Sequence, residues 1–184
     1  MRAVVRLNLV LAAAFVLGAA TAAPMAMAQK AMCHGHTVTI VGTAGDDALV
    51  GTAGSDVISG LAGRDTIEGR GGDDIICGGP GDDHLRSNRG DDLVDGGGGD
   101  DRIVGGMGAD ELIGAAGNDR LSGGQDSDAL RGGGGNDGMI GGRGDDALNG
   151  GPGSDVAKYH DSRSSMSGVP TTTTSSMATR IAMP

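Results

Sequence analysis

Large aliphatic residues recur at every ninth position along most of this chain. Counted from Gly42, the eighth residue of each nine-residue repeat is Leu, Ile, Val or Met from Leu49 to Leu148, and the smaller Ala157 closes the series. One residue stands on either side of each aliphatic before glycine-rich sequence resumes, which is the pattern of a very short strand with one buried side chain. A fixed short period predicts a solenoid, a stack of small and equal units.

Thirteen such repeats run from Gly42 to Lys158. Position four is glycine in every repeat except the tenth, which has Asp126, and position one is glycine in every repeat except the sixth, which has Ser87. Glycine allows the backbone of a loop to enter positive φ and to approach an ion closely. Position six is aspartate in all thirteen repeats: Asp47, Asp56, Asp65, Asp74, Asp83, Asp92, Asp101, Asp110, Asp119, Asp128, Asp137, Asp146 and Asp155.

This pattern resembles the G-G-x-G-x-D-x-U-x repeat of RTX (hemolysin-type) calcium-binding proteins, in which U is a large aliphatic residue. The resemblance covers 117 of the 184 residues. It implies an all-β fold, namely a right-handed parallel β-roll in which two repeats form one coil. It also implies that Ca²⁺ binds between stacked loops. Secreted bacterial calcium-binding proteins of this kind are similar to the chain around both of its cysteines as well.

In such a roll each repeat lies under the next repeat but one, so we expect Asp47 beneath Asp65 and Asp137 beneath Asp155. Two carboxylates about 5 Å apart repel by roughly 1 kcal/mol in water, and by several times that near a protein surface. Because Ca²⁺ takes about six to eight oxygen ligands, each such pair, together with loop carbonyls, is expected to hold an ion. Seven repeats on one side and six on the other allow at most eleven sites.

The core expected from this pattern is thin. Each repeat buries one aliphatic side chain, whereas the chain contains 38 Gly, whose ordering is costly in entropy, and it has one Phe, one Tyr and no Trp. We therefore expect the metal-free chain to be unfolded and calcium binding to be coupled to folding.

Charge and motifs exclude several classes of function. The net charge is −10, and residues 42–158 hold 23 Asp and Glu against 9 Lys and Arg. An acidic chain without aromatic clusters is a poor binder of nucleic acid and of anionic membranes, so cations are the expected partners. Neither H-E-x-x-H nor G-x-S-x-G occurs, and the four histidines form no catalytic arrangement. The sequence therefore predicts a protein that is not an enzyme.

Two alternatives to a stand-alone calcium-binding rod with a structural or interaction role stay open. RTX blocks accompany exported enzymes and adhesins, so the chain also fits an accessory module of such a system. An ice-binding solenoid would need a flat outward array of threonines. The outward positions seven and nine instead hold pairs such as Thr66 with Glu68 and His84 with Arg86, which makes this the less favoured alternative.

Residues 1–28 have the features of a secretory signal. Two arginines precede an apolar run over residues 9–23, and Ala26-Met27-Ala28 forms an A-x-A cleavage site before Gln29. An uncleaved membrane anchor is the alternative, but the run is short for a span and no apolar stretch follows it. We expect export by the general secretory route to an extracellular location, where calcium is near millimolar, with no membrane span after cleavage. The extracellular partner is unknown.

The two cysteines belong to different segments of the chain. Cys33 lies in residues 29–41, which we interpret as an N-terminal cap with Ile40 at the buried position, and Cys77 lies at position nine of repeat four. An even count of cysteines in an exported chain favours a disulfide between them. Two alternatives are free thiols and a zinc or copper site made by Cys33, His34 and His36.

Residues 159–184 follow the last repeat. We expect Tyr159 to lie over the last coil beside Ala157, and the Ser/Thr-rich remainder, with PTTTTSS at its centre, to be disordered. No apolar strand is expected after the tyrosine, so the C-terminal end of the roll is predicted to lack a complete cap.

Overall fold

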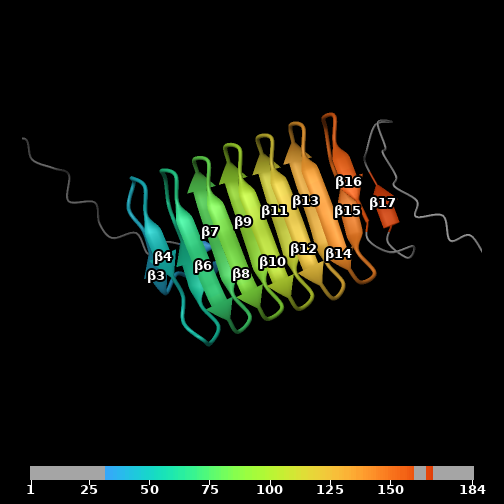
Figure 1. Ribbon diagram of the computed structural model, residues 1–184. Coiled ribbons are helices and arrows are strands. Elements are labelled where there is room, and N and C mark those ends of the chain that lie inside the picture. Colours follow the sequence, from blue (N-terminus) through green and yellow to red (C-terminus); the bar gives the residue numbers. More distant parts are fainter. Residues whose placement is uncertain (1–31, 160–164, 168–184) are drawn as a thin grey trace, which may run out of the picture.

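The computed structural model describes residues 32–159 and 165–167 of the chain. All regular secondary structure in these residues is β-strand (Figure 1), and they contain no helix that is long and apolar enough to span a membrane. The strands are β1 (Met32–Cys33), β2 (His36–Thr37), β3 (Ile40–Val41), β4 (Ala48–Val50), β5 (Val57–Ser59), β6 (Thr66–Gly71), β7 (Ile75–Pro80), β8 (His84–Arg89), β9 (Leu93–Gly98), β10 (Arg102–Met107), β11 (Glu111–Ala116), β12 (Arg120–Gln125), β13 (Ala129–Gly134), β14 (Gly138–Arg143), β15 (Ala147–Asn149), β16 (Val156–Lys158) and β17 (Ser165–Ser167). The predicted secretory signal, residues 1–28, lies outside the described residues.

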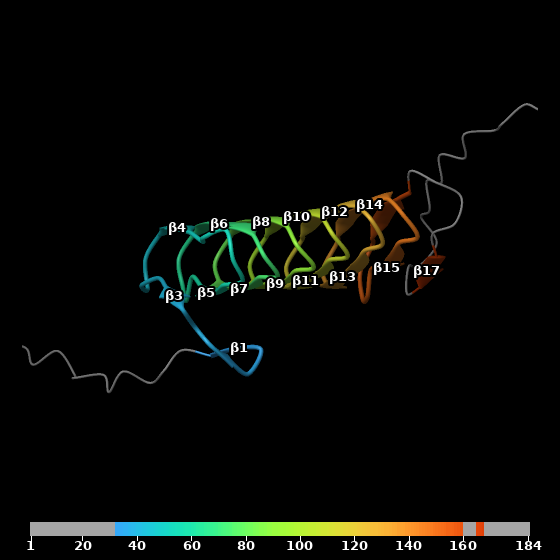
Figure 2. The same ribbon diagram turned by 90° about the horizontal axis from the view of Figure 1, so that it is seen from below.

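Two parallel sheets lie face to face and form the roll (Figure 2). The even sheet contains the seven even-numbered strands from β4 to β16, and the odd sheet contains the eight odd-numbered strands from β3 to β17. Within a sheet each strand pairs with the strand two repeats away, so Leu121 is in register with Ile103 on one side and Met139 on the other. The predicted all-β parallel β-roll with two repeats per coil is confirmed.

The core is a double row of side chains from position eight, one row from each sheet. The buried row members are 0–3 % exposed: Ile58, Ile67, Ile76, Leu85, Val94, Ile103, Leu112, Leu121, Leu130, Met139, Leu148 and Ala157. Ile40, Leu49 and Tyr159 are partly buried and pack against the two ends of this cluster. Tyr159 therefore contacts the core where the sequence placed it.

Most strands are longer than the sequence pattern indicates. We predict strands of three residues, positions seven to nine, but β6 to β14 each have six residues and continue through positions one to three of the next repeat. In β10 and β12, for example, Gly106 pairs with Gly124 and Met107 with Gln125. Pairing extends because glycine-rich positions one and two lie directly over their equivalents in the next coil. The loop proper is accordingly three residues long rather than six.

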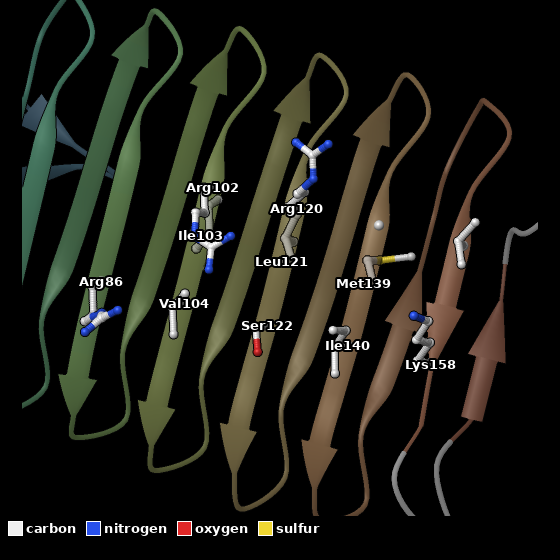
Figure 3. A pocket seen from close by; sticks show the side chains of 12 residues that line it. Arg86, Arg102, Ile103, Val104, Arg120, Leu121, Ser122, Met139, Ile140 and Lys158 are labelled. Atoms are coloured by element: carbon white, nitrogen blue, oxygen red, sulfur yellow. The ribbon is translucent and has the colours of Figure 1, made fainter. Parts of the chain in front are cut away.

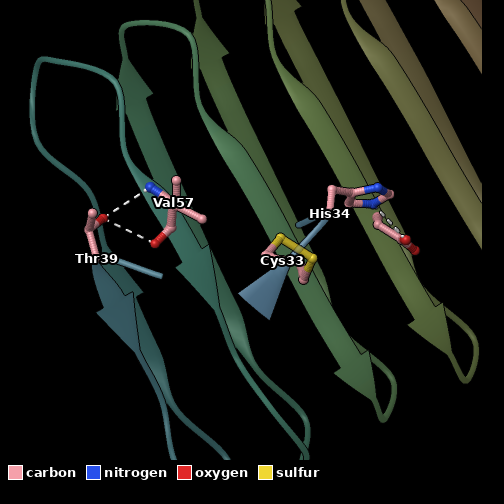
Figure 4. The surroundings of a disulfide bond; sticks show 6 residues. Cys33, His34, Thr39 and Val57 are labelled. Atoms are coloured by element: carbon pink, nitrogen blue, oxygen red, sulfur yellow. Dashed lines mark hydrogen bonds and ion pairs between the residues drawn. A yellow bond between two sulfur atoms is a disulfide. The ribbon is translucent and has the colours of Figure 1, made fainter. Parts of the chain in front are cut away.

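The N-terminal cap has two parts. Ile40 of β3 pairs in parallel with Ile58, so residues 40–41 extend the odd sheet by one strand, as predicted. Before it, β1 and β2 form an antiparallel hairpin that folds back along the roll (Figure 2). Cys33 is fully buried there and is bonded to Cys77, with 5.9 Å between the two Cα atoms (Figure 4). The predicted disulfide is present, and the alternative of two free thiols is wrong.

The C-terminal end differs from the prediction. Residues Ser165–Ser167 form β17, which pairs with β15 and places Met166 in register with Leu148. The expectation of a disordered tail without a further strand is therefore wrong for these three residues. The segment has neither the glycine nor the aspartate of the repeat, so the period gave no signal for it. Without β17, the edge of the odd sheet at β15 would present unpaired backbone groups, and any extended segment can pair with such groups.

Candidate metal centre

The loops between strands stack so closely that their backbones touch. Gly99, at position four of repeat seven, has φ of 123°, and a Cβ built on it would overlap the carbonyl oxygen of Gly81 in the coil below. An L-residue with a side chain is strained at this φ and lacks space as well. Glycine at position four therefore allows a loop to stack directly on the loop of the coil below. Each loop is held directly against its counterpart, eighteen residues away.

The position-six aspartates form a continuous ladder of hydrogen bonds along each side of the roll. In every one of the eleven stacked pairs, the backbone N–H of one aspartate donates to Oδ1 of the aspartate two repeats later. The distances from Asp83 N to Asp101 Oδ1 and from Asp101 N to Asp119 Oδ1 are both 2.8 Å. Stacking of each repeat on the next but one is thus observed, and one oxygen of each upper carboxylate is used by the backbone.

The second carboxylate oxygen is left over in most repeats. Oδ2 is buried and without a hydrogen-bond partner among the described residues in Asp65, Asp74, Asp83, Asp92, Asp101, Asp110, Asp119, Asp128, Asp137 and Asp155. A buried carboxylate oxygen without a donor is costly and is normally compensated by a charge or a donor. These ten oxygens are the feature of the fold that most favours bound cations.

In eight of these ten repeats, Oδ2 faces a backbone carbonyl oxygen of the coil above across the position-one glycine; Asp92, which has Ser87 at position one, and Asp155, in the last repeat, are the exceptions. A Cβ built on Gly96 would overlap Oδ2 of Asp101 and would lie 3.0 Å from the carbonyl oxygen of Gly114. The same convergence recurs at Gly105, where Oδ2 of Asp110 and the carbonyl oxygen of Gly123 meet. Carboxylate and carbonyl oxygens are the ligands that Ca²⁺ takes. The donor set therefore fits a calcium ion.

Burial raises the pKa of these carboxyl groups. It raises the pKa of Asp101, Asp110 and Asp128 to about 7, and neighbouring aspartates of the same ladder add to the effect, whereas a backbone N–H from the coil below lowers it. For Asp74, Asp83 and Asp119 the same causes raise the pKa to about 6. In the absence of a cation, ionised carboxylates are thus unfavourable at these positions.

Carboxylates alone do not complete a site. In residues 32–159, no group of three or more His, Cys, Asp or Glu side chains lies close enough together to hold a metal ion. A bound ion would therefore need backbone carbonyl oxygens as its remaining ligands, as the sequence predicts. The alternative site of Cys33, His34 and His36 is wrong, because Cys33 is in the disulfide and has no free thiolate.

The first two repeats differ from the rest. Thr43 donates to Oδ2 of Asp47 through its backbone N–H at 2.6 Å and through its hydroxyl at 3.0 Å, and Thr52 does the same for Asp56. These two carboxylates are therefore already supplied with donors. The prediction treated all thirteen aspartates alike and missed this difference. The signal was present in the sequence, because repeats one and two have threonine at position two.

A second ladder, at position five, was not predicted. The side chain there accepts a hydrogen bond from the backbone N–H of position five in the coil above, as from Asp100 N to Asp82 Oδ1 at 3.0 Å and from Asn118 N to Asp100 Oδ1 at 2.7 Å. Its direction is opposite to that of the position-six ladder. The signal in the sequence is that position five is Asp, Asn or Ser in eleven of thirteen repeats.

Two departures from the repeat have definite structural effects. Asp126 keeps the left-handed backbone of position four, with φ of 73°, and its carboxylate accepts a hydrogen bond from Gly108 N at 3.3 Å. Ser87 is fully buried, and its hydroxyl donates to the carbonyl oxygen of Gly105 at 3.4 Å. The serine side chain therefore occupies the space beside Asp92 that position-one glycine leaves open in the other repeats.

A family model that describes four copies of the RTX calcium-binding nonapeptide repeat matches residues 41–76, 50–85, 78–112, 104–139 and 128–157. The chain belongs to the RTX calcium-binding repeat family. These matches together span residues 41–157, which is the region that forms the stacked coils and both hydrogen-bond ladders. No protein in the curated set matches the chain. The RTX repeat is thus established by the sequence pattern and by the fold it produces.

Proposed function

We propose that the chain is a secreted calcium-binding protein in which ions held between stacked loops drive folding of the roll. The observation that carries this proposal is the row of buried Oδ2 atoms, most of which face a backbone carbonyl oxygen across position one. Bound Ca²⁺ would supply the positive charge that offsets these carboxylates. The position-six aspartates from Asp47 to Asp155 are the proposed carboxylate ligands, at no more than eleven interfaces. The aspartates of the first two repeats are expected to bind Ca²⁺ most weakly, because threonine already donates hydrogen bonds to their Oδ2 atoms.

The proposed role of the folded rod is structural or interactive rather than catalytic. A signal over residues 1–28 and a disulfide between Cys33 and Cys77 both support export to an oxidising compartment. Extracellular calcium is near millimolar, which suits sites of moderate affinity. The exported chain would therefore fold where calcium is available. Service as an accessory module of an exported enzyme or adhesin system is compatible with the same chemistry.

Isothermal titration of the chain without residues 1–28 tests calcium binding directly. We expect several equivalents of Ca²⁺ with affinity in the micromolar to millimolar range, and little heat with Mg²⁺, which dehydrates reluctantly and demands octahedral geometry. The variant Asp101→Asn should bind fewer equivalents, whereas Asp95→Asn, an aspartate outside the ladder, should bind as the wild type does. Binding of less than one equivalent at millimolar Ca²⁺ would refute the proposal.

A further inference from the structure

The positive charges of the roll are gathered on one sheet. Nine Lys and Arg side chains occur in residues 42–158, and seven of them lie on strands of the even sheet: Arg70, Arg86, Arg89, Arg102, Arg120, Arg143 and Lys158. The strands of the even sheet contain one acidic residue, Glu68. A strongly acidic chain thus presents a cationic face, which its net charge of −10 conceals.

These side chains are exposed and are not used within the fold. The ion pairs among described residues are Arg64 with Asp82, Arg131 with Glu111, and His34 with Asp95, none of which involves a cation of the even sheet. Arg102 and Arg120 are in register on neighbouring strands, which places like charges one strand spacing apart, about 4.8 Å. Adjacent like charges are unfavourable unless an anion lies between or above them.

A shallow groove of about 430 Å³ runs over the same strands (Figure 3). Arg86, Arg102, Arg120 and Lys158 line it together with Val104 and Ile140. Gly138 also lines the groove and contributes no side chain at position seven of β14. The groove therefore combines guanidinium groups with apolar surface across several coils.

We propose that the outer face of the even sheet binds a linear sulfated polysaccharide. Guanidinium groups donate paired hydrogen bonds to planar and tetrahedral oxyanions, and sugar rings have apolar faces that suit Val104 and Ile140. Carboxylate and phosphate oxygens are strong calcium ligands, so polymers rich in them would compete with the loops for Ca²⁺, whereas sulfate esters bind calcium weakly. This inference rests on the proposed function, because the cationic face exists only in the folded roll.

The surroundings of the face disfavour broader anionic partners. Asp82 and Asp100 are exposed in the loops that precede β8 and β10, at the edge of the sheet. A membrane laid flat on the sheet would bring lipid phosphates close to these carboxylates. Stacking of nucleic-acid bases favours a platform of several aromatic side chains, and the strands of the even sheet contain no Phe, Tyr or Trp and a single histidine, His84. A narrow linear chain avoids the acidic loops and follows the row of arginines.

The test is binding of labelled dextran sulfate by the protein in millimolar calcium, with uncharged dextran as the control. We expect binding to dextran sulfate that weakens steeply with added NaCl and is lost in chelator. The double variant Arg102→Gln/Arg120→Gln should weaken binding by about tenfold or more. The matched double variant Arg64→Gln/Arg131→Gln removes the same charge from outside the even sheet and should bind within about twofold of the wild type.

Equal weakening in both double variants would overturn the proposal, since it would show an effect of net charge alone. Tighter binding to vesicles of anionic lipid or to polyphosphate than to dextran sulfate would overturn the choice of partner. Circular dichroism of the same samples separates this inference from the proposed function. A chain that folds in calcium but does not bind dextran sulfate contradicts the inference alone, whereas a chain that stays unfolded in calcium contradicts the proposed function.

Discussion

Position one of the repeat shows how one atom decides whether a loop has room for an ion. At Gly96 and Gly105 the absent side chain leaves a small space between a carboxylate oxygen and a carbonyl oxygen. At Ser87 the side chain fills that space, and its hydroxyl engages the Gly105 carbonyl that would otherwise face Asp92. Twelve repeats out of thirteen have glycine at this position. Repeat six is therefore expected to interrupt the column of ions.

Replacing this serine should restore the missing site. Ser87→Gly is expected to add about one calcium equivalent in a calorimetric titration, because it reopens the space beside Asp92. Gly105→Ser introduces the same obstruction two repeats later and should remove about one equivalent. Unchanged stoichiometry in both variants would show that position one does not border the bound ion.

The raised pKa values of the buried aspartates predict how the metal-free chain responds to acid. In the folded state the pKa is about 6 for Asp83 and about 7 for Asp101, above the ordinary value of 3.8. Between about pH 4 and pH 7 the folded state therefore binds more protons than the unfolded state. The contribution of these groups to the free energy of unfolding of the metal-free chain is highest below about pH 4 and is lost as the pH rises through 7.

In chelator, the β signal in circular dichroism should increase as the pH falls from 7.5 to 4.5, because protons then take over the neutralising role of calcium. Asp101→Asn, which mimics a protonated carboxyl group, should show a larger β signal than the wild type at pH 7.5 without calcium and should bind calcium less well. A β signal in chelator that declines on acidification would contradict the assignment of buried, unfavourably ionised carboxylates.

At the scale of single elements, the hairpin β1–β2 owes its position to a covalent bond. It makes no ladder with either sheet, and it is held by the bond from Cys33 to Cys77 and by the contact of His34 Nε2 with Asp95 Oδ2 at 2.9 Å. Removal of the bond by Cys33→Ser/Cys77→Ser should lower the free energy of unfolding in calcium by about 4 kcal/mol, the loop-closure value for this separation. Urea denaturation measures it. His34→Ala, which keeps the disulfide, is expected to cost less than about 1 kcal/mol.

Stacking of coils gives every interior aspartate two neighbours. Asp101 is linked to Asp83 on one side and to Asp119 on the other, whereas Asp110 belongs to the ladder on the opposite side of the roll. Asp101→Ala with Asp119→Ala should therefore be markedly non-additive in calcium affinity, because the two residues share an interface. Asp101→Ala with Asp110→Ala should be close to additive. The reverse result would mean that the eighteen-residue coil does not govern calcium binding.

For the molecule as a whole, the period predicted the fold, the core and the stacking order. Position eight alone specified the buried row from Ile58 to Ala157, because one inward residue per strand leaves no alternative register. The period could not give the length of the strands, since pairing at Gly106 depends on loop contacts between coils. It could not give the pairing of residues 165–167 either, because that strand uses backbone groups rather than the repeat.

The sequence also predicted which residues form most of the candidate site, but not the role of each carboxylate oxygen. Spacing identified the aspartates and placed Asp101 between Asp83 and Asp119. Which carboxylate oxygen stays free depends on the direction of the Asp101 N–H, and this is visible only once the coils are stacked. The donors from Thr43 and the cationic face around Arg102 likewise come from residues at variable positions of the repeat, where a pattern search has least power.

The central claim is that calcium supplies the charge that lets buried aspartates stack, and that the roll folds only when it does so. Far-ultraviolet circular dichroism of the chain without residues 1–28 tests it most directly, at pH 7.5 in chelator and again with millimolar Ca²⁺. We expect the spectrum of an unfolded chain in chelator and a cooperative change to a β spectrum as calcium is added. A β-rich spectrum in chelator that calcium leaves unchanged would contradict the account.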